Sequence, residues 1–457
     1  MTIDAYSTAT EITSALRRKE VSSREMLDLY LARVAAHNPA VNAVVALDAD
    51  RARAAAAAAD EAAARGEWLG PLHGLPITIK DCFETEGIVT TCGDPLLAEY
   101  VPDRDALAVG RLKAAGAIVF GKTNTPLQTL DGQTYNAVYG TTNNPWDLTR
   151  TPGGSSGGAA AALAAGMTPL DLGSDIGGSI RLPAHHSGVF GHKPSWGIVP
   201  ERGHIPNQAG SLHKRDINVN GPLARGVDDL ELALDVIAGP DELDAIGWKL
   251  KLPPARHATL RDFRVAAWLE DPFCPSDEAM LAVHNTAAAA IERAGATIDR
   301  TARPGFSLKE AVDVFNPLIQ AAISPGTRAE ISHREVIAAD ELRQTMRRQW
   351  ATFFRQFDVL LAPVMLTTAF PHMQEGDFRT RKFRVNGADR PYLEMTTWTG
   401  LVGGALLPST VIPVGLTQSG LPVGIQIIGN FLEDRTTLAF ARLASELLGG
   451  FRRPPGY

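Results

Sequence analysis

Two glycine-rich turns, each holding a serine, constrain this chain more than any other feature. The first turn runs from Gly153 to Gly158 and contains Ser155, and the second runs from Asp175 to Pro183 and contains Ser179. Glycine adopts backbone conformations that other residues avoid, and it leaves neighbouring N–H groups uncovered. The pattern therefore predicts two turns whose backbone N–H groups converge on one point next to a serine hydroxyl.

Such turns supply most of what amide hydrolysis requires. A serine becomes a nucleophile when a neighbouring base removes its proton, and backbone N–H groups stabilise the oxyanion that then forms. Lys80 ends an apolar, strand-like run that begins at Leu75. Burial there disfavours the ammonium form, and a neutral lysine is a usable base. We expect Ser179 as nucleophile and an oxyanion hole made of the N–H groups of Ile176, Gly177, Gly178 and Ser179.

Each of these features also has an ordinary structural interpretation. Glycine and serine together are common in flexible loops, and the Ala-rich stretch from Ala159 makes Ser155 or Ser156 a candidate helix N-cap. A buried Lys80 also fits a second interpretation, an ion pair with an acidic residue, either Asp81 or Asp175. The residues alone leave these alternatives open, and the combination of all three elements in one chain favours catalysis.

The two turns and their surroundings resemble the signature of the amidase signature family of serine hydrolases. The resemblance is gapless from Gly121 through the Thr142–Trp146 run to Pro194, and weaker similarity extends from Leu72 to Gln426. It implies a Ser-Ser-Lys triad, with Lys80 as base, Ser155 as bridging serine after a cis peptide bond from Gly154, and Ser179 as nucleophile. It implies no metal and no cofactor.

The resemblance also implies where substrate binds. Residues that follow the Gly121–Asn124 run line the acyl pocket in the family, which here means Gln128, Thr129, Leu130 and Asp131. The segment of about 300–400 is the variable part, and we expect it to cover the pocket. Its apolar residues are candidates either for this cover or for the core: Phe306, Phe315, Leu318, Ile319 and Trp398. The chain departs from the family pattern at Leu127 and Ala159.

Composition agrees with a globular enzyme that acts on small molecules. Of the 457 residues 45% are hydrophobic, enough for a large core, and the net charge of −7 argues against nucleic acid and anionic membranes. No apolar stretch approaches the ~20 residues of a membrane span. We expect a cytoplasmic monomer or homodimer whose partner is an amide or carbamate substrate.

Cysteine and histidine offer no competing site in the sequence. The three cysteines have no metal-binding spacing, and Cys82, although close to Lys80, is predicted to be a buried thiol. His185 and His186 are adjacent, so their side chains do not converge on one metal. We expect both to have structural roles.

Helix and strand patterns alternate along the whole chain, which indicates an α/β protein. Strands are predicted at 77–79, 117–120, 265–268, 359–362 and 425–428, and helices at 22–37, 48–65, 105–115, 229–237, 275–294 and 436–448. No Pro/Ser-rich linker divides the chain, so we expect one large domain over 1–457, with the signature core at about 70–200. The resemblance implies a twisted mixed sheet of about eleven strands covered by helices on both faces.

Three functions are compatible with these residues. The first is a stand-alone hydrolase of aryl or alkyl amides, which extends to carbamates because they present the same carbonyl beside nitrogen. The second is the glutamine-hydrolysing subunit of a tRNA-dependent amidotransferase, which shares these motifs, although Ile176 and the run from His192 to Trp196 favour the first. The third is an α/β-hydrolase esterase, because Gly153–Gly157 also matches G-x-S-x-G. That third interpretation requires a strand before Ser155 and a late histidine such as His372.

Overall fold

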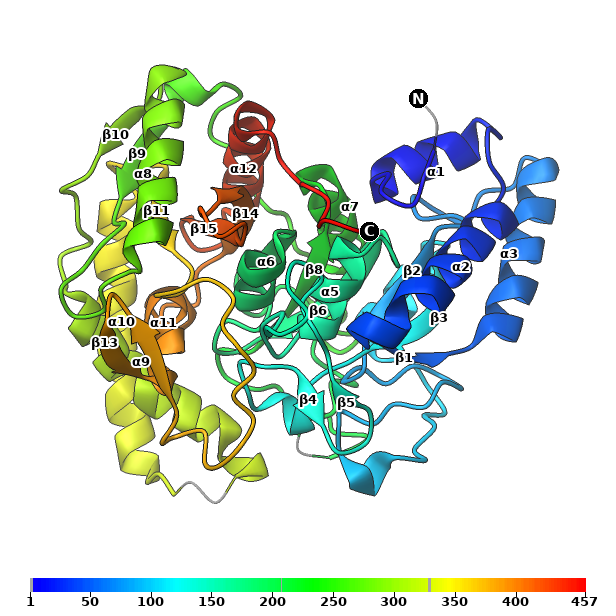
Figure 1. Cartoon of the computed structure of the whole chain (residues 1–457), viewed down its shortest axis with the longest axis horizontal. Coiled ribbons are helices and arrows are strands. Elements are labelled where there is room, and N and C mark those ends of the chain that lie inside the picture. The colour runs from blue at the N-terminus through cyan, green and yellow to red at the C-terminus, as the bar shows by residue number, and fades with distance from the viewer. Residues whose placement is uncertain (1–2, 207, 328–329) are drawn as a thin grey trace.

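The computed structural model describes residues 3–206, 208–327 and 330–457 and consists of one large mixed sheet between layers of helices (Figure 1). The sheet has 11 strands in the order β1-β3-β2-β6-β8-β7-β14-β15-β11-β9-β10. Its strands are β1 Val44–Leu47, β2 Pro76–Lys80, β3 Ile118–Thr123, β6 Leu170–Asp175, β7 Phe190–Lys193, β8 Val219–Ala224, β9 Arg264–Ala267, β10 Thr297–Asp299, β11 Val359–Pro363, β14 Ser409–Leu416 and β15 Pro422–Ile428. Two small hairpins lie outside it, β4 Tyr135–Asn136 with β5 Gly140–Thr141, and β12 Lys382–Val385 with β13 Ala388–Pro391.

Parallel and antiparallel pairs share this sheet. β2 lies parallel to β3 and β6, and β9 lies parallel to β10 and β11. The pairs in the middle of the sheet, from β6 to β15, are antiparallel. The predicted α/β class, with a mixed sheet of about eleven strands, is therefore confirmed.

Helices pack on both faces of the sheet, as predicted. In β11, Val359 and Leu361 join one hydrophobic cluster while Leu360 and Ala362 join the other, because successive side chains of a strand point to opposite faces. The helices are α1 Ala9–Arg17, α2 Ser23–Val41, α3 Ala49–Ala64, α4 Leu107–Ala114, α5 Gly157–Ala164, α6 Arg181–Ser187, α7 Val227–Ile237, α8 Glu278–Arg293, α9 Leu308–Ile323, α10 His333–Phe353, α11 Thr397–Gly403 and α12 Asp434–Leu448.

The local signals explain where several of these helices begin. Ser22 and Asp48 accept hydrogen bonds from the first turns of α2 and α3, as their sequence positions predicted. α2 is longer than predicted and ends at Val41, where Asn42 adopts the left-handed conformation. Within the described residues no helix is long and apolar enough to cross a membrane.

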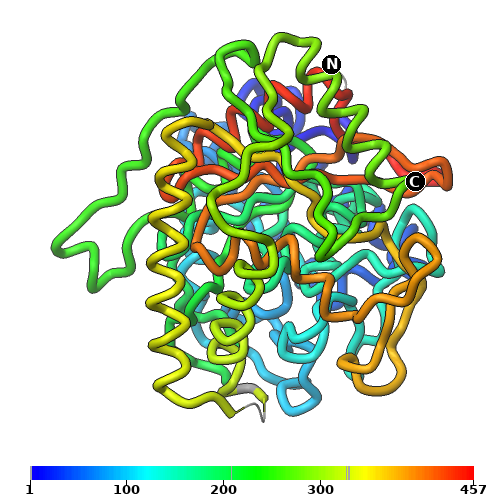
Figure 2. The backbone as a smooth tube through the Cα atoms, turned by 90° about the vertical axis from the view of Figure 1, so that its left-hand side faces the viewer, coloured from blue at the N-terminus to red at the C-terminus, as the bar shows by residue number. Residues whose placement is uncertain are grey.

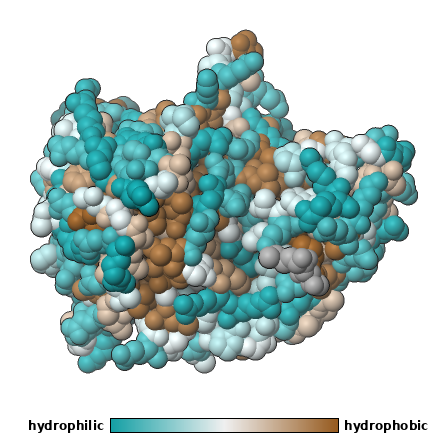
Figure 3. Space-filling view, turned by 90° about the horizontal axis from the view of Figure 1, so that it is seen from above, coloured by the Kyte–Doolittle hydropathy of each residue, from teal (hydrophilic) through white to brown (hydrophobic). Residues whose placement is uncertain are grey.

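The segment between α7 and β9 projects from the body of the protein (Figure 2). The same view shows α10 upright along one side. Seen from above, polar residues are spread over much of the surface, with apolar residues in patches between them (Figure 3).

The core also accounts for several residues of the variable segment. Phe315, Leu318 and Trp398 are buried in the cluster that contains α9, α10 and α11. Phe306 packs edge-on against Trp350 in the same cluster. These four residues are therefore core, while Ile319 is only half-buried. Residues 328–329 of the segment lie outside the described part of the chain.

Candidate active site

Lys80 and the two serine turns meet at one edge of the sheet. Lys80 is the last residue of β2, and Asp175 is the last residue of the adjacent parallel strand β6. Parallel strands bring their carboxyl ends to the same edge, so Lys80 lies beside the turn that follows β6. The turn that contains Ser155 reaches this edge from the start of α5.

Among the described residues, the Lys80 amine has hydrogen bonds to serine hydroxyls and none to a carboxylate. Its Nζ lies 2.7 Å from Ser155 Oγ and 3.1 Å from Ser174 Oγ, and the side chain is fully buried. In the described chain, no ion pair joins Lys80 to Asp81 or Asp175. The Asp81 carboxylate accepts hydrogen bonds from Thr91, and Asp175 pairs with Arg181. The ion-pair interpretation of Lys80 is thus wrong.

Burial lowers the pKa of Lys80 from its usual value, because the ammonium form loses its hydration. The side chain is thereby shifted toward the neutral amine, which accepts a proton. Ser174, which was not predicted to take part, is the second hydroxyl beside this amine. Ser174 directly precedes Asp175, so the sequence marked this region as part of the site. It did not predict the contact between Ser174 and Lys80.

The turn that contains Ser155 is held by close backbone contacts. The peptide bond from Gly154 to Ser155 is cis, which confirms the expectation from the family resemblance. A Cβ on Gly154 would lie 2.6 Å from the Asp131 carbonyl oxygen, so only glycine fits there. Ser156 occupies the N-cap position of α5 but makes no capping hydrogen bond with its side chain. Capping therefore does not explain the serines.

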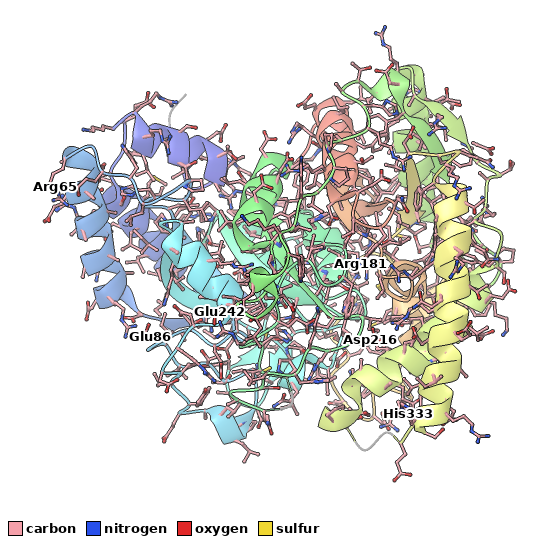
Figure 4. The ribbon with its side chains drawn as sticks, turned by 180° about the vertical axis from the view of Figure 1, so that it is seen from behind. Arg65, Glu86, Arg181, Asp216, Glu242 and His333 are labelled. Carbon is pink, nitrogen blue, oxygen red and sulfur yellow. The ribbon has the colours of Figure 1, made fainter. Side chains whose placement is uncertain are left out.

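The turn that contains Ser179 is arranged around the Asp175 carboxylate. Asp175 accepts hydrogen bonds from the N–H groups of Gly178 at 2.8 Å and Ile180 at 3.1 Å, and it forms a fully buried ion pair with Arg181 at 2.9 Å. Burial opposes ionisation of Asp175, but the Arg181 guanidinium outweighs it and holds the pKa of this carboxyl below its usual value. Arg181 lies near the middle of the molecule (Figure 4).

These contacts change one part of the predicted oxyanion hole. The N–H of Gly178 is already bonded to Asp175, so it is not free to bind a substrate oxygen. Within the described residues, the N–H groups of Ile176, Gly177 and Ser179 have no acceptor in the protein. Gly178 instead has φ +122°, a conformation that other residues rarely adopt. It shapes the turn rather than donating to the oxyanion.

A small apolar pocket opens beside Ser179. Its volume is about 190 Å³, and Ser179, Gly154, Ile176 and Gly177 form one side of it. The remaining lining, called the far wall below, comes from α9, from the segment near Phe378 and from the short helix Tyr392–Thr396. The apolar side chains of this wall are Ile319, Ile323, Phe378, Leu393 and Met395.

Three of the four predicted substrate-binding residues line this pocket: Thr129, Leu130 and Asp131. Gln128 does not. Its side chain donates a hydrogen bond to Asp94 at 2.7 Å, so its role in substrate binding stays a prediction that this pocket does not support. Gln128 has φ 50°, which re-aims its side chain relative to its neighbours.

Asp131 is the pocket's carboxylate, and its partners were not predicted. Arg381 donates to Asp131 at 3.0 Å, and the hydroxyls of Tyr392 and Tyr135 donate to it at 2.5 Å and 3.0 Å. The ion pair is buried, with the two side chains 7% and 8% exposed. Arg381 also donates to the backbone carbonyls of Gln374, Glu375 and Gly376. The charge on Asp131 is therefore neutralised at the pocket wall.

Among the described residues, no hydrogen bond joins a histidine to Lys80, Ser155 or Ser179, whereas the Cys82 thiol lies 3.8 Å from Ser174 Oγ. Burial lowers the pKa of His185 to about 4, and this side chain bonds the backbone of Thr367 and Gly424. His372 lies 3.1 Å from the Asn143 side chain. Burial raises the pKa of the Cys82 thiol. Among the described residues, no group of three or more His, Cys, Asp or Glu side chains is arranged to hold a metal.

The α/β-hydrolase interpretation is wrong on two counts. In the part of the chain that the structure describes, no strand directly precedes Ser155, because the residues from Thr151 to Gly154 are irregular. His372, its candidate base, bonds Asn143 rather than either serine.

Comparison with known proteins places the whole chain in one group. A sequence model of the family described as Amidase matches residues 25–325 and 307–438. The A subunit of the glutamyl-tRNA(Gln) amidotransferase of Moorella thermoacetica is 34% identical over 495 residues, which cover 98% of each chain. Other relatives at similar identity carry the same description.

Solved structures give the same result. A chain from a vestigial protein complex, connected with the origins of an s-triazine catabolic enzyme, has a TM-score of 0.85 and 28% identity, covering 98% of this chain and 100% of that one. A bacterial aryl acylamidase of the amidase signature enzymes has a TM-score of 0.84 and 27% identity, covering 97% and 96%.

Proposed function

Because this chain belongs to the amidase signature family, it is a hydrolase that acts on amide C–N bonds, and we propose that its substrates carry an uncharged, apolar group next to the scissile carbonyl. The observation that carries this proposal is the pocket beside Ser179, whose far wall is aliphatic and aromatic. A pocket of about 190 Å³ has room for one ring or a short alkyl chain rather than a long one.

The contact of Lys80 with Ser155, together with the family resemblance, supports the following catalytic roles. Neutral Lys80 accepts a proton from Ser155, which takes one from Ser179, and Ser179 Oγ attacks the carbonyl carbon. The N–H groups of Ile176, Gly177 and Ser179 stabilise the resulting oxyanion. The C–N bond breaks as the relay returns the proton to the amine. Water then attacks the acyl-Ser179 ester, gives its proton to the relay, and Ser179 leaves with that proton.

Carbamates fit the same cycle. Their carbonyl carbon also bears a nitrogen, so attack by Ser179 and protonation of the leaving amine proceed in the same way. The additional carbamate oxygen is uncharged and needs no charged partner. In the described pocket, the carboxylate of Asp131 is already paired with Arg381. Aryl carbamates are therefore proposed as a second class of substrate for this chain.

The glutamine-hydrolysing component of an amidotransferase is the second candidate, and the curated relatives favour it. Amidotransferase A subunits match this chain over almost its full length at about one-third identity. Glutamine carries an ammonium and a carboxylate, and a site for it needs a charged partner for each. Here Asp131 is already paired with Arg381. Arg379 also lines the pocket, but its side chain is 72% exposed, so its guanidinium stays hydrated rather than buried beside a substrate carboxylate. The pocket chemistry thus supports the uncharged substrate instead.

One panel of substrates distinguishes the candidates. The purified chain is offered an acetanilide, benzamide, an aryl carbamate, a p-nitrophenyl ester and glutamine, each over a range of concentrations. The proposal expects kcat/KM for the anilide or the carbamate to exceed that for glutamine by ~100-fold or more, because a buried unpaired charge costs several kcal/mol. A higher kcat/KM for glutamine than for the anilide and the carbamate would refute this proposal and support the glutamine-hydrolysing function instead.

A further inference from the structure

The peptide plane between Gly177 and Gly178 is held by side chains from two distant parts of the chain. On one side the Gly178 N–H donates to Asp175 Oδ1 at 2.8 Å. On the other, Thr399 Oγ1 donates to the Gly177 carbonyl oxygen at 2.7 Å. Two consecutive glycines offer little steric resistance to rotation of the plane between them. These two hydrogen bonds therefore set its orientation.

Thr399 also contacts the rest of the turn. It is fully buried on α11, and its backbone carbonyl accepts a hydrogen bond from Arg181 at 2.9 Å. A Cβ placed on Gly178 would lie 2.9 Å from Thr399 Cγ2, so the threonine packs directly on that glycine. Asp175, Arg181 and Thr399 thus enclose the turn, and Thr399 is the contact that comes from outside the signature motif.

The held plane lies between two of the proposed oxyanion donors. The Gly177 N–H belongs to the peptide before it and the Ser179 N–H to the peptide after it. Rotation of the middle plane would therefore re-aim both donors. Preorganised donors give oxyanion stabilisation its strength, because they need not reorganise during the reaction.

We infer that Thr399 is a positioning residue for the oxyanion hole. Its hydroxyl fixes the Gly177–Gly178 peptide so that the flanking N–H groups of Gly177 and Ser179 point at the substrate carbonyl oxygen. This inference rests on the proposed role of Ser179 as nucleophile. It makes the hole depend on α11, an element far from the glycine turns in the sequence.

The same helix connects the hole to the substrate pocket. α11 directly follows the short helix Tyr392–Thr396, which forms part of the pocket wall. α11 packs closely on α9. A Cβ on Gly400 of α11 would lie 2.6 Å from the ring of Phe315, which belongs to α9. α9 in turn supplies Ile319 to the pocket. The element that positions the donors is thus packed against the element that recognises substrate.

The test compares Thr399→Val with Thr399→Ser on an anilide substrate. Valine keeps the shape and removes the hydroxyl, so we expect kcat to fall ~10–30-fold with KM unchanged, less than the ~10²–10³-fold typical for loss of a donor itself. Serine restores the hydroxyl and should recover kcat to within ~3-fold of wild type. Thr437→Val is the matched control, because Thr437 is also fully buried with its hydroxyl bonded to a backbone carbonyl, on α12.

A second measurement reports on the hole itself. An aryl trifluoromethyl ketone forms an anionic adduct with a serine, so its inhibition constant should rise in Thr399→Val by the factor that kcat/KM loses. The acid limb of the pH–rate profile should stay where it is in wild type, because it reports Lys80.

Three results would overturn the inference. One is wild-type kcat in a folded Thr399→Val enzyme, a second is equal loss in the valine and serine variants, and the third is unchanged ketone inhibition. If Thr399→Val does not fold, Thr399→Ala takes its place in the same comparison. Retained turnover in Ser179→Ala would instead refute the proposed function, so the two failures are distinguishable.

Discussion

The turn that carries Ser179 is enclosed by buried polar contacts, whereas the far wall of the adjacent pocket is half-exposed and mainly apolar. Around the turn, the Asp175–Arg181 ion pair is fully buried, and Asp175 also bonds backbone N–H groups. On the far wall, Ile319, Ile323 and Phe378 are only partly buried. The proposed chemistry is thus placed at the sheet edge, while the proposed substrate selection belongs to a separate and less buried segment.

This difference has an energetic reason. Buried hydrogen bonds and ion pairs require good geometry, because an unsatisfied partner costs several kcal/mol, and they therefore hold catalytic groups in one arrangement. Apolar contacts are non-directional and tolerate substitution. Mutations around the turn should therefore change the rate for every substrate, and mutations in the wall should change the ranking of substrates.

The largest effect is expected from Ser179→Ala. Loss of the nucleophile should reduce turnover of all substrates by ~10³-fold or more without unfolding the protein. The measurement is steady-state hydrolysis together with labelling by a fluorophosphonate. The Ser156→Ala variant, changed in the neighbouring turn, should still be labelled by the fluorophosphonate at Ser179. Labelling of Ser156 in place of Ser179 would reassign the nucleophile.

Lys80→Met should be the next most harmful change, and it should depend on the leaving group. We expect a loss of ~10²–10⁴-fold for an anilide and a smaller loss for a p-nitrophenyl ester, because an amine leaving group needs the relayed proton. In wild type the protonated lysine is inactive. Activity should therefore rise with pH to a plateau, and its midpoint should lie below the usual lysine pKa because burial lowers it. A flat profile from acid to mildly alkaline pH would contradict the relay.

Arg381→Met tests the charge balance of the pocket wall. It leaves Asp131 buried without its cation, so kcat/KM for an uncharged anilide should fall ~10–100-fold. An amide with an ammonium group should lose less or gain. The double variant Arg381→Met/Asp131→Asn removes both charges, and its activity on the anilide should exceed that of Arg381→Met alone. Independent, additive losses in this double-mutant cycle would argue against a coupled pair.

Ile319→Ala should alter substrate ranking with a smaller effect. Removal of its side chain enlarges the pocket, so kcat/KM should fall ~5–20-fold for an aryl substrate and change little for acetamide. Leu342→Ala, at a side chain 57% exposed on α10, serves as a control. An equal loss of kcat/KM for both substrates would mean that Ile319 supports the chemical step rather than substrate selection.

The smallest effects are expected from metal removal and from His372. Dialysis against a strong chelator should leave kcat within ~2-fold, since the relay and the backbone donors need no metal. His372→Ala should keep most activity, because this side chain bonds Asn143 and neither serine. Restoration of a lost activity by added metal would contradict the mechanism.

Sequence reasoning was most successful where the signal is local. The cis bond at Gly154, the caps at Ser22 and Asp48, and the strand that ends at Lys80 depend on residues close together in the chain. It was less successful in the pocket. Gln128 was predicted to bind substrate from its position in the family pattern, and its side chain instead bonds Asp94 in a stretch where both Gln128 and Thr129 have positive φ. Phe315 and Trp398 were candidates for the cover, but packing made them core.

The sequence by itself determined the proposed catalytic groups, because a serine in each glycine turn and a lysine at a strand end are set by short-range pattern and by burial. Only the tertiary structure decided which groups stay free to act. Arg381 neutralises Asp131 from 250 positions away, and Thr399 reaches Gly177 across 222 positions. No local periodicity encodes such pairs, because they form only when the two halves of the sheet bring their connecting segments to the same edge.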